Sequence, residues 1–217
     1  MAKNVYVGVN NVARKVTSMY VGVNGVARKI TKGYVGVNGV AQQFFAGANY
    51  INFTSNPAPT SWSGGGVAAN SESSASNTYG TWKCYATAKA FSSSYMAKNC
   101  FDNNTSSNSY FRTESGKVNY YAFLRLPTDI AIKPSTFSWY IAVANTSSEI
   151  QGLDENGNWE TLAIQTETAP SSATNYTFNV STTKYYTAFR CYMVPSGSYS
   201  AKLFDFSITS GTIKDSR

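Results

Sequence analysis

The side chains that most often carry out acid–base or metal chemistry are scarce in this sequence. Its 217 residues include no histidine, which removes the commonest general base and the commonest metal ligand. The carboxylates are scattered apart from Asp154 and Glu155, which adjoin in an expected turn, and no nucleophile-elbow, phosphate-loop or zinc-protease motif is present. We therefore expect no enzymatic activity. A glycosidase that uses two separated carboxylates remains the alternative.

Three cysteines, Cys84, Cys100 and Cys191, form an odd set without the paired spacing of a zinc site or a disulfide framework. We expect buried free thiols, which fit folding in a reducing cytoplasm. The N-terminal stretch lacks the apolar segment of a signal peptide, and no apolar run approaches the length of a membrane span. We expect a protein that is made in the cytoplasm and does not insert into a membrane.

The net charge of +7 is concentrated at the N-terminal end. Six basic residues precede the first acidic residue, Glu72, so residues 1–71 carry +6. Such a segment indicates either an acidic partner surface or a solvated strand face. Nucleic acid is not the expected partner, because the aromatic residues repeat on strands rather than on a loop or helix suited to base contact.

Residues 1–47 contain three copies of a 14-residue repeat. The octapeptide YVGVNGVA stands at 20–27 and again at 34–41, and a copy with Asn-Asn in place of Asn-Gly stands at 6–13. Asn-Gly between alternating residues is the strongest short signal for a β-hairpin with a type I′ turn. A turn at Asn24-Gly25 gives the following cross-strand pairs: Val23 with Val26, Gly22 with Ala27, Val21 with Arg28, and Tyr20 with Lys29.

The repeat also predicts assembly. Because its length is even, equivalent residues face the same side in every copy, and three copies predict an antiparallel meander of about six strands. A two-sided strip of this size cannot offset its ordering entropy alone, so it must pack on copies of itself or on a partner. We expect an intertwined homotrimer, with these anchor and assembly residues: Tyr6, Arg14, Tyr20, Arg28 and Tyr34.

The rest of the chain predicts a second all-β unit. Aromatic residues make up 15% of the sequence, mostly Tyr and Phe, beside many Ser, Thr and Asn, a mix that favours strands and polar loops. Residues 48–80, rich in Gly, Ser, Asn and Pro, predict a linker and an entry segment. Short aromatic-rich strands and frequent turn signals then predict a β-sandwich over 81–217.

The repeat resembles arrays found at one end of bacteriophage structural proteins, near tail or adhesion genes. The resemblance covers residues 5–45. It implies a virion location for a chain made in the cytoplasm of a bacterial host. It also implies that the basic repeats contact other virion proteins.

Several stretches of the second unit resemble the discoidin-like domain, also called the coagulation-factor type C or galactose-binding-like jelly roll. They are TSNPAP (54–59), CFDNNTSSNSYF (100–111), YYAFLRLPTDIAI (120–132), EIQGLDENGNWETL (149–162), KYYTAFRCYM (184–193) and AKLFDFSI (201–208). The resemblance implies a jelly-roll β-sandwich that binds glycans, phospholipid headgroups or proteins through loops at one end.

On a phage particle the implied ligand is host cell-surface carbohydrate, which an aromatic plate and polar donors suit. Carried over by loop position, the resemblance implies these ligand-binding residues: Trp82, Tyr85, Tyr110, Phe111, Arg112 and Tyr199. For each aromatic residue the alternative is packing in the core or at its rim. Trp139 and Trp159 lie in strand patterns, so we expect them in the core.

Many members of that family hold a structural Ca²⁺ beside an acidic loop. The resemblance implies Asp102 and Thr105 as ligands, with Asp205 at the position of a C-terminal Glu. In this sequence Asn103 replaces the loop glycine, and Phe111 stands where Trp is usual. We expect no other cofactor.

Together these features predict a virion fibre or adhesin that assembles through residues 1–47 and binds host carbohydrate through jelly-roll loops. The alternative is a purely structural head, tail or baseplate decoration protein without a ligand. The loop aromatics would serve either role.

Overall fold

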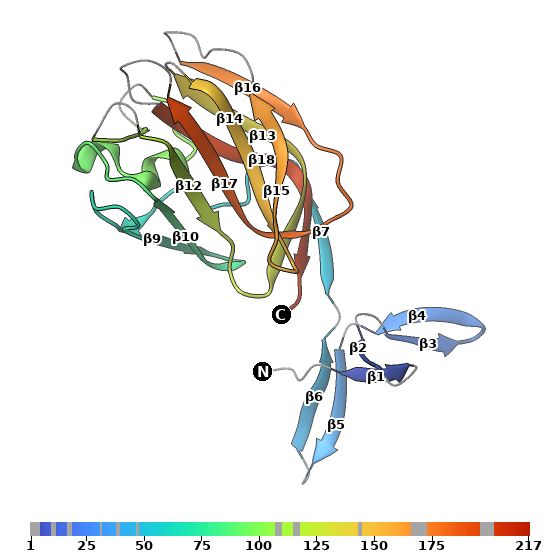
Figure 1. Cartoon of the computed structure of the whole chain (residues 1–217). Coiled ribbons are helices and arrows are strands. Elements are labelled where there is room, and N and C mark those ends of the chain that lie inside the picture. Colours follow the sequence, from blue (N-terminus) through green and yellow to red (C-terminus); the bar gives the residue numbers. More distant parts are fainter. Residues whose placement is uncertain are drawn as a thin grey trace. The chain divides into compact units, whose positions relative to one another are not determined.

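The structure is a computed structural model that describes residues 5–9, 12–16, 19–30, 32–37, 40–46, 48–106, 110–114, 118–142, 145–165, 173–195 and 202–217. These residues form antiparallel strands and two short 3-10 helices (Figure 1). The chain divides into two compact units, Met1–Ile51 with Lys214–Arg217 and Asn52–Ile213. Among the described helices, none has the length and hydropathy needed to span a membrane.

The N-terminal unit consists of three β-hairpins, each a separate two-stranded sheet. The strands are β1 (Tyr6–Val9), β2 (Val12–Lys15), β3 (Met19–Val23), β4 (Val26–Ile30), β5 (Lys32–Val37) and β6 (Val40–Ala46). In the second hairpin all four predicted cross-strand pairs are confirmed. Asn24 and Gly25 have φ of 51° and 77°, the positive values that a type I′ turn requires at both central positions. The equivalent turns of the other two copies lie outside the described residues.

The predicted six-stranded meander is wrong in one respect, because no strand of one hairpin pairs with the next hairpin among the described residues. Edge-to-edge pairing would add backbone hydrogen bonds but would cover neither face of the strip. Both faces remain open: Tyr6, Tyr20, Tyr34 and Arg28 are exposed, as is Val21 on the face opposite Tyr20. Arg14 pairs with Val7 in the backbone ladder of the first hairpin. The intertwined trimer stays a prediction.

The second unit is a β-sandwich, so the predicted fold class of hairpins followed by a jelly-roll β-sandwich is confirmed. One layer has the order β8-β9-β10-β12-β17-β14-β15, and the other has the order β16-β13-β18-β11, with β7 beside β18 (Figure 1). The elements are β7 (Asn49–Phe53), β8 (Ser63–Gly64), β9 (Ser73–Asn77), β10 (Gly80–Ala86), η1 (Ser93–Tyr95), η2 (Ala97–Cys100), β11 (Phe111–Arg112), β12 (Tyr120–Arg125), β13 (Ile130–Ala142), β14 (Asn145–Asp154), β15 (Trp159–Gln165), β16 (Thr174–Asn179), β17 (Tyr186–Pro195) and β18 (Lys202–Asp215).

Aromatic rings fill the space between the layers. Phe137 of β13 lies 5.6 Å from Phe189 of β17 and 5.4 Å from Phe206 of β18, measured between ring centroids. The three cysteines are buried free thiols, as predicted. Burial raises the pKa of the Cys84 thiol to about 12, so this thiol stays protonated and unreactive at neutral pH.

The Gly- and Ser-rich segment 48–80 is attached to the sandwich at several points. Asn56 donates to Ser207 at 3.3 Å through its side-chain amide, and the Trp62 indole donates to the carbonyl of Phe101 at 2.9 Å. The segment also contributes β7, β8 and β9. It therefore belongs to the sandwich as an entry segment rather than hanging free as a linker.

Deleting residues 1–47 tests whether the sandwich folds alone. Its core is built within Asn52–Ile213, so we expect residues 48–217 to melt cooperatively, within about 3 °C of the full-length protein. Circular dichroism and calorimetry measure this. Loss of the cooperative transition would mean that the repeats are required for the sandwich to fold.

Candidate functional site

Two of the six predicted ligand residues lie in the core, and this corrects the prediction. Trp82 is 0% exposed and Phe111 is 1% exposed. On β10, strand alternation places Trp82 on the inner face together with Cys84, while Phe111 packs edge-on against Tyr120 with ring centroids 4.8 Å apart. Neither ring has a face open to a ligand.

The other four predicted residues do not gather at one place. Tyr85 lies on the outer face of β10, where it stacks on Phe123 at 4.6 Å and accepts a hydrogen bond from Arg125 at 3.1 Å. Tyr110 directly precedes β11, and Arg112 is the last residue of that strand. Tyr199 lies outside the described residues.

Tyr110 and Arg112 belong to a surface cluster that we call the Phe91–Arg112 group. Its members are Phe91, Tyr95, Tyr110, Arg112 and Lys202. The Arg112 guanidinium carbon lies 4.3 Å from the centroid of the Phe91 ring, and Lys202 Nζ lies 5.3 Å from that of Tyr110. Tyr95 bridges the two rings, at 5.9 Å from Phe91 and 4.6 Å from Tyr110.

Backbone hydrogen bonds hold the cluster in place. The Phe91 amide donates to the carbonyl of Arg112 at 2.8 Å, and Arg112 pairs with Lys202 across β11 and β18. Tyr110 is the buried member of the group, at 6% exposure, and its ring centroid lies 4.7 Å from that of Phe204. Phe91 is thereby fixed to the end of a strand pair although it lies in a loop.

The group combines an open ring with fixed cations. Phe91 is 48% exposed, and the buried Tyr110 keeps its hydroxyl proton because burial, with smaller contributions from Tyr95, raises its pKa. A half-exposed ring with a guanidinium over one face can present its remaining surface to the C–H face of a sugar, while the guanidinium donates to the hydroxyls. Sequence reasoning missed Phe91, since a single aromatic residue before three serines carries no periodic signal.

Trp139 and Trp159, the two tryptophans expected in the core, differ in their burial. Trp139 is 0% exposed, as predicted. The prediction for Trp159 is wrong, because this residue lies half-buried on the face of β15 that points away from the core, with the Arg190 guanidinium carbon 4.0 Å from its ring.

The three side chains implied as Ca²⁺ ligands make hydrogen bonds within the protein, and the bound ion stays a prediction. The Asp205 carboxylate accepts hydrogen bonds from the Asn103 amide at 3.1 Å and from the Ser207 hydroxyl at 2.6 Å, so both of its oxygens are engaged by protein donors. Asp102 accepts from the Asn104 amide at 3.0 Å, and Thr105 is exposed. Among the described residues no cluster of three or more acidic, cysteine or histidine side chains could hold a metal ion.

The hydrogen bonds of Asp205 with Asn103 and Ser207 close the acidic loop. Asn103 takes a left-handed conformation with φ of 58°, which Asn tolerates where glycine is usual. Burial of Asp205 at 4% exposure, with a smaller contribution from the charge of Asp102, raises the pKa of its carboxyl to about 6. The Asp205 carboxyl is too deeply buried to reach a substrate. Asp205 and Asp102 therefore do not support acid–base catalysis as a pair.

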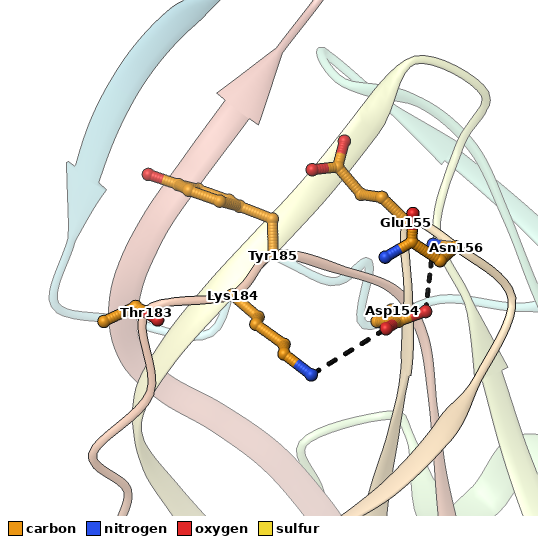
Figure 2. A pocket seen from close by; sticks show the side chains of 6 residues that line it. All are labelled: Asp154, Glu155, Asn156, Thr183, Lys184 and Tyr185. Carbon is orange, nitrogen blue, oxygen red and sulfur yellow. Dashed lines mark hydrogen bonds and ion pairs between the residues drawn. The ribbon is translucent and has the colours of Figure 1, made fainter.

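A small pocket of about 170 Å³ lies at the β14–β15 turn. Figure 2 shows Lys184 pointing toward Asp154, with its Nζ 3.9 Å from the carboxylate. Lys184 also pairs with Glu160. Backbone hydrogen bonds from Asn158 and then Asn156 lower the pKa of Asp154, which therefore stays ionised. Lys184 thus pairs with carboxylates from both sides of the turn, which gives the pocket a structural explanation.

Comparisons with known proteins give structural likeness at low identity. No protein-family model matches the sequence, and no curated protein matches it. A point mutant of chitosan-binding module 1 from a chitosanase/glucanase of Paenibacillus sp. IK-5 is 16% identical with a TM-score of 0.46, covering 69% of this chain and 99% of the module. The family 32 carbohydrate-binding module of NanJ from C. perfringens, in complex with galactose, is 16% identical with a TM-score of 0.46, covering 60% and 93%. We draw no conclusion about the ligand of this chain from likeness at that level.

Asp205→Asn tests the buried carboxyl. Because the folded-state pKa lies above that of an unfolded Asp, the folded protein binds the proton more tightly, and this contribution to stability is lost as pH rises from about 4 through 6. The variant does not titrate, so its free energy of unfolding relative to wild type should rise by up to about 3 kcal/mol between pH 4 and 7. Urea unfolding at several pH values measures it.

Asp154→Asn is the matched control. The pKa of Asp154 is lowered in the folded protein, so its contribution to the free energy of unfolding is lost as pH falls. A pH-independent difference between Asp205→Asn and wild type would show that Asp205 is ionised throughout.

Addition of EDTA should leave the melting temperature unchanged, whereas a rise on addition of Ca²⁺ would mean that the loop rearranges to bind the ion.

Proposed function

We propose that this chain is a bacteriophage virion surface protein, a fibre or adhesin, that binds host cell-surface carbohydrate through the Phe91–Arg112 group. The observation that supports this most directly is the exposed Phe91 ring with the Arg112 guanidinium held 4.3 Å from its centroid. Sugar recognition needs this combination of an open aromatic surface and a directional donor.

The rigidity of the group supports binding. Phe91 is fixed to β11 by a backbone hydrogen bond and packs on Tyr95, which in turn packs on Tyr110. A site that is already ordered loses little conformational entropy when a ligand binds.

The hairpin repeats supply the assembly part of the proposal. Each hairpin is a two-stranded sheet with both faces exposed, which is marginally stable without a partner. We propose that three chains intertwine their repeats and that the basic side chains contact other virion proteins. Three linked copies of a weak sugar site gain avidity through effective concentration.

The second candidate is a decoration protein without a ligand, located in the virion head, tail or baseplate. It is favoured by the burial of Trp82 and Phe111, which leaves fewer loop aromatics for a ligand than the sequence predicted. Catalysis is not part of either proposal.

Phe91→Ala and Arg112→Gln should each weaken glycan binding by about tenfold or more, because they remove the stacking surface and the directional donor. The full-length protein is first tested on a glycan array, and the affinity of each variant for the glycan found is measured by calorimetry. Neither change should lower the melting temperature by more than about 3 °C, since the Phe91 and Arg112 side chains are both partly exposed and lie outside the core.

Phe111→Ala is the matched control from the core. It should cost about 3–5 kcal/mol of unfolding free energy, while the folded fraction keeps its glycan affinity. A wild-type protein that binds no glycan on the array would favour the decoration role. Binding that survives Phe91→Ala and Arg112→Gln would place the site elsewhere.

The assembly proposal predicts that the full-length protein is a trimer and that residues 48–217 are a monomer. Multi-angle light scattering distinguishes the two masses. A truncated protein that keeps the full-length oligomeric state would exclude the repeats as the assembly element.

A further inference from the structure

The layer that contains β10, β12, β17, β14 and β15 carries a row of aromatic and polar side chains on its outer face. This row is separate from the Phe91–Arg112 group. Strand pairing aligns five residues across β10, β12, β17, β14 and β15, namely Tyr85, Phe123, Arg190, Gln151 and Thr161. Residues two positions away along the same strands point to the same side of the sheet. They add Tyr121, Tyr192, Arg125, Glu149 and Trp159 to this outer face.

Arg190 lies at the centre of the row and is surrounded by aromatic rings. Its guanidinium carbon is 4.0 Å from the Trp159 ring centroid, 4.2 Å from that of Tyr121 and 5.7 Å from that of Phe123. The rings of Trp159 and Phe123 also meet edge-on at 5.6 Å. Stacking of this kind holds a guanidinium in one plane and removes part of its hydration.

A hydrogen-bond relay fixes the orientation of that plane. Arg190 Nε donates to Gln151 Oε1 at 2.7 Å, and Gln151 Nε2 donates to Glu149 Oε2 at 2.7 Å. Thr161 donates to the same Glu149 oxygen at 3.0 Å. The relay uses the Nε side of the guanidinium and leaves its two terminal amino groups unengaged.

Those amino groups have no acceptor in the described part of the chain and are not fully buried. No hydrogen bond or ion pair joins Nη1 or Nη2 of Arg190 to a described residue. The described side-chain atoms that are buried without a partner are Trp139 Nε1, Ser148 Oγ and Gln165 Nε2, and none belongs to Arg190. Burial lowers the pKa of Arg190, as expected for a cation that has lost water without gaining an ionic partner at contact distance.

The charges of this face favour an anion. Arg125 and Arg190 are cations, and Glu149 is the carboxylate among the ten residues of the face named above. Glu149 is already occupied by Gln151 and Thr161 and makes no ion pair with Arg190 within 4 Å. A guanidinium held in this way offers parallel N–H groups that match a carboxylate or a phosphate in a two-point contact.

We propose that this outer face is a second binding site, which takes a saccharide bearing a carboxylate or phosphate, with the anion on the amino groups of Arg190. The exposed edges of Tyr121, Tyr192 and Trp159 contact the sugar ring beside it. The site goes beyond the proposed function, since its ligand chemistry and its residues differ from those of the Phe91–Arg112 group. Failure of one site leaves the other standing.

The test uses the full-length protein and two pairs of charged and neutral probes. Trigalacturonate is compared with its methyl ester, and galactose 6-phosphate with galactose. Calorimetry at low salt should show binding of at least one charged probe about tenfold or more tighter than its neutral counterpart, and weaker binding as salt is added. The pair that shows the difference identifies carboxylate or phosphate as the recognised group.

Arg190→Lys keeps the charge but removes the two-point contact, and it should reduce affinity for the charged probe by about tenfold. Arg217→Lys is the matched control, because it makes the same substitution at a guanidinium that pairs with Asp215 and belongs to neither proposed site, and it should leave this affinity unchanged. Equal affinity for charged and neutral probes, no binding of any probe, or full affinity in Arg190→Lys would each overturn the proposal.

Hydrogen exchange on the wild-type protein keeps the proposal testable if Arg190→Lys does not fold. Binding of the charged probe should slow amide exchange in peptides from β14 and β17. Protection confined to peptides outside the outer face would contradict the site.

Discussion

The arrangement of side chains on this protein depends on the packing of Phe137 between the two layers. Its ring contacts Phe189 on β17 and Phe206 on β18. Because β17 lies between β12 and β14, burying Phe189 determines which face of these three strands points inward. Alternation then places Arg190 outward, next to the rings of β12. On β18 the same packing fixes the register that pairs Arg112 with Lys202. Both candidate sites are therefore consequences of the core.

Local rules were enough to predict the hairpins. Asn24-Gly25 specifies its turn through two residues that tolerate positive φ, and the register follows from the turn alone. Alternation also held information that motif comparison overlooked. Trp82 and Tyr85 are three positions apart on β10, so they point to opposite faces and could not both line one site. The same reasoning separates Phe111 from Arg112, which are adjacent on β11.

The remaining features depend on contacts between distant segments. Phe91 gains its place through a backbone hydrogen bond to Arg112, which no local pattern indicates. Trp159 and Arg190 meet because β14 lies between β15 and β17 and its register with β15 shifts between Ile150 and Gln151, so only the tertiary register brings the two side chains together. The hydrogen bonds of the acidic loop also depend on distant segments. The Ser207 hydroxyl that donates to the Asn103 side chain lies about a hundred residues away in the chain, so this contact could not be inferred.

The repeats follow a different logic from the sandwich, because their structure is local but their stability is not. A hairpin of this length forms its turn and register by itself, yet it buries neither of its faces. Any partner that covers the Tyr20 face of one hairpin finds the same residue types on the other hairpins, since Tyr6, Tyr20 and Tyr34 hold the same position in the three repeats. The entropy lost in ordering a hairpin reduces the binding free energy of its contact, so a single contact is weak. Several identical contacts on one chain then act as one strong attachment through effective concentration. The number of repeats, rather than the strength of any one of them, sets how firmly such a segment holds its partner.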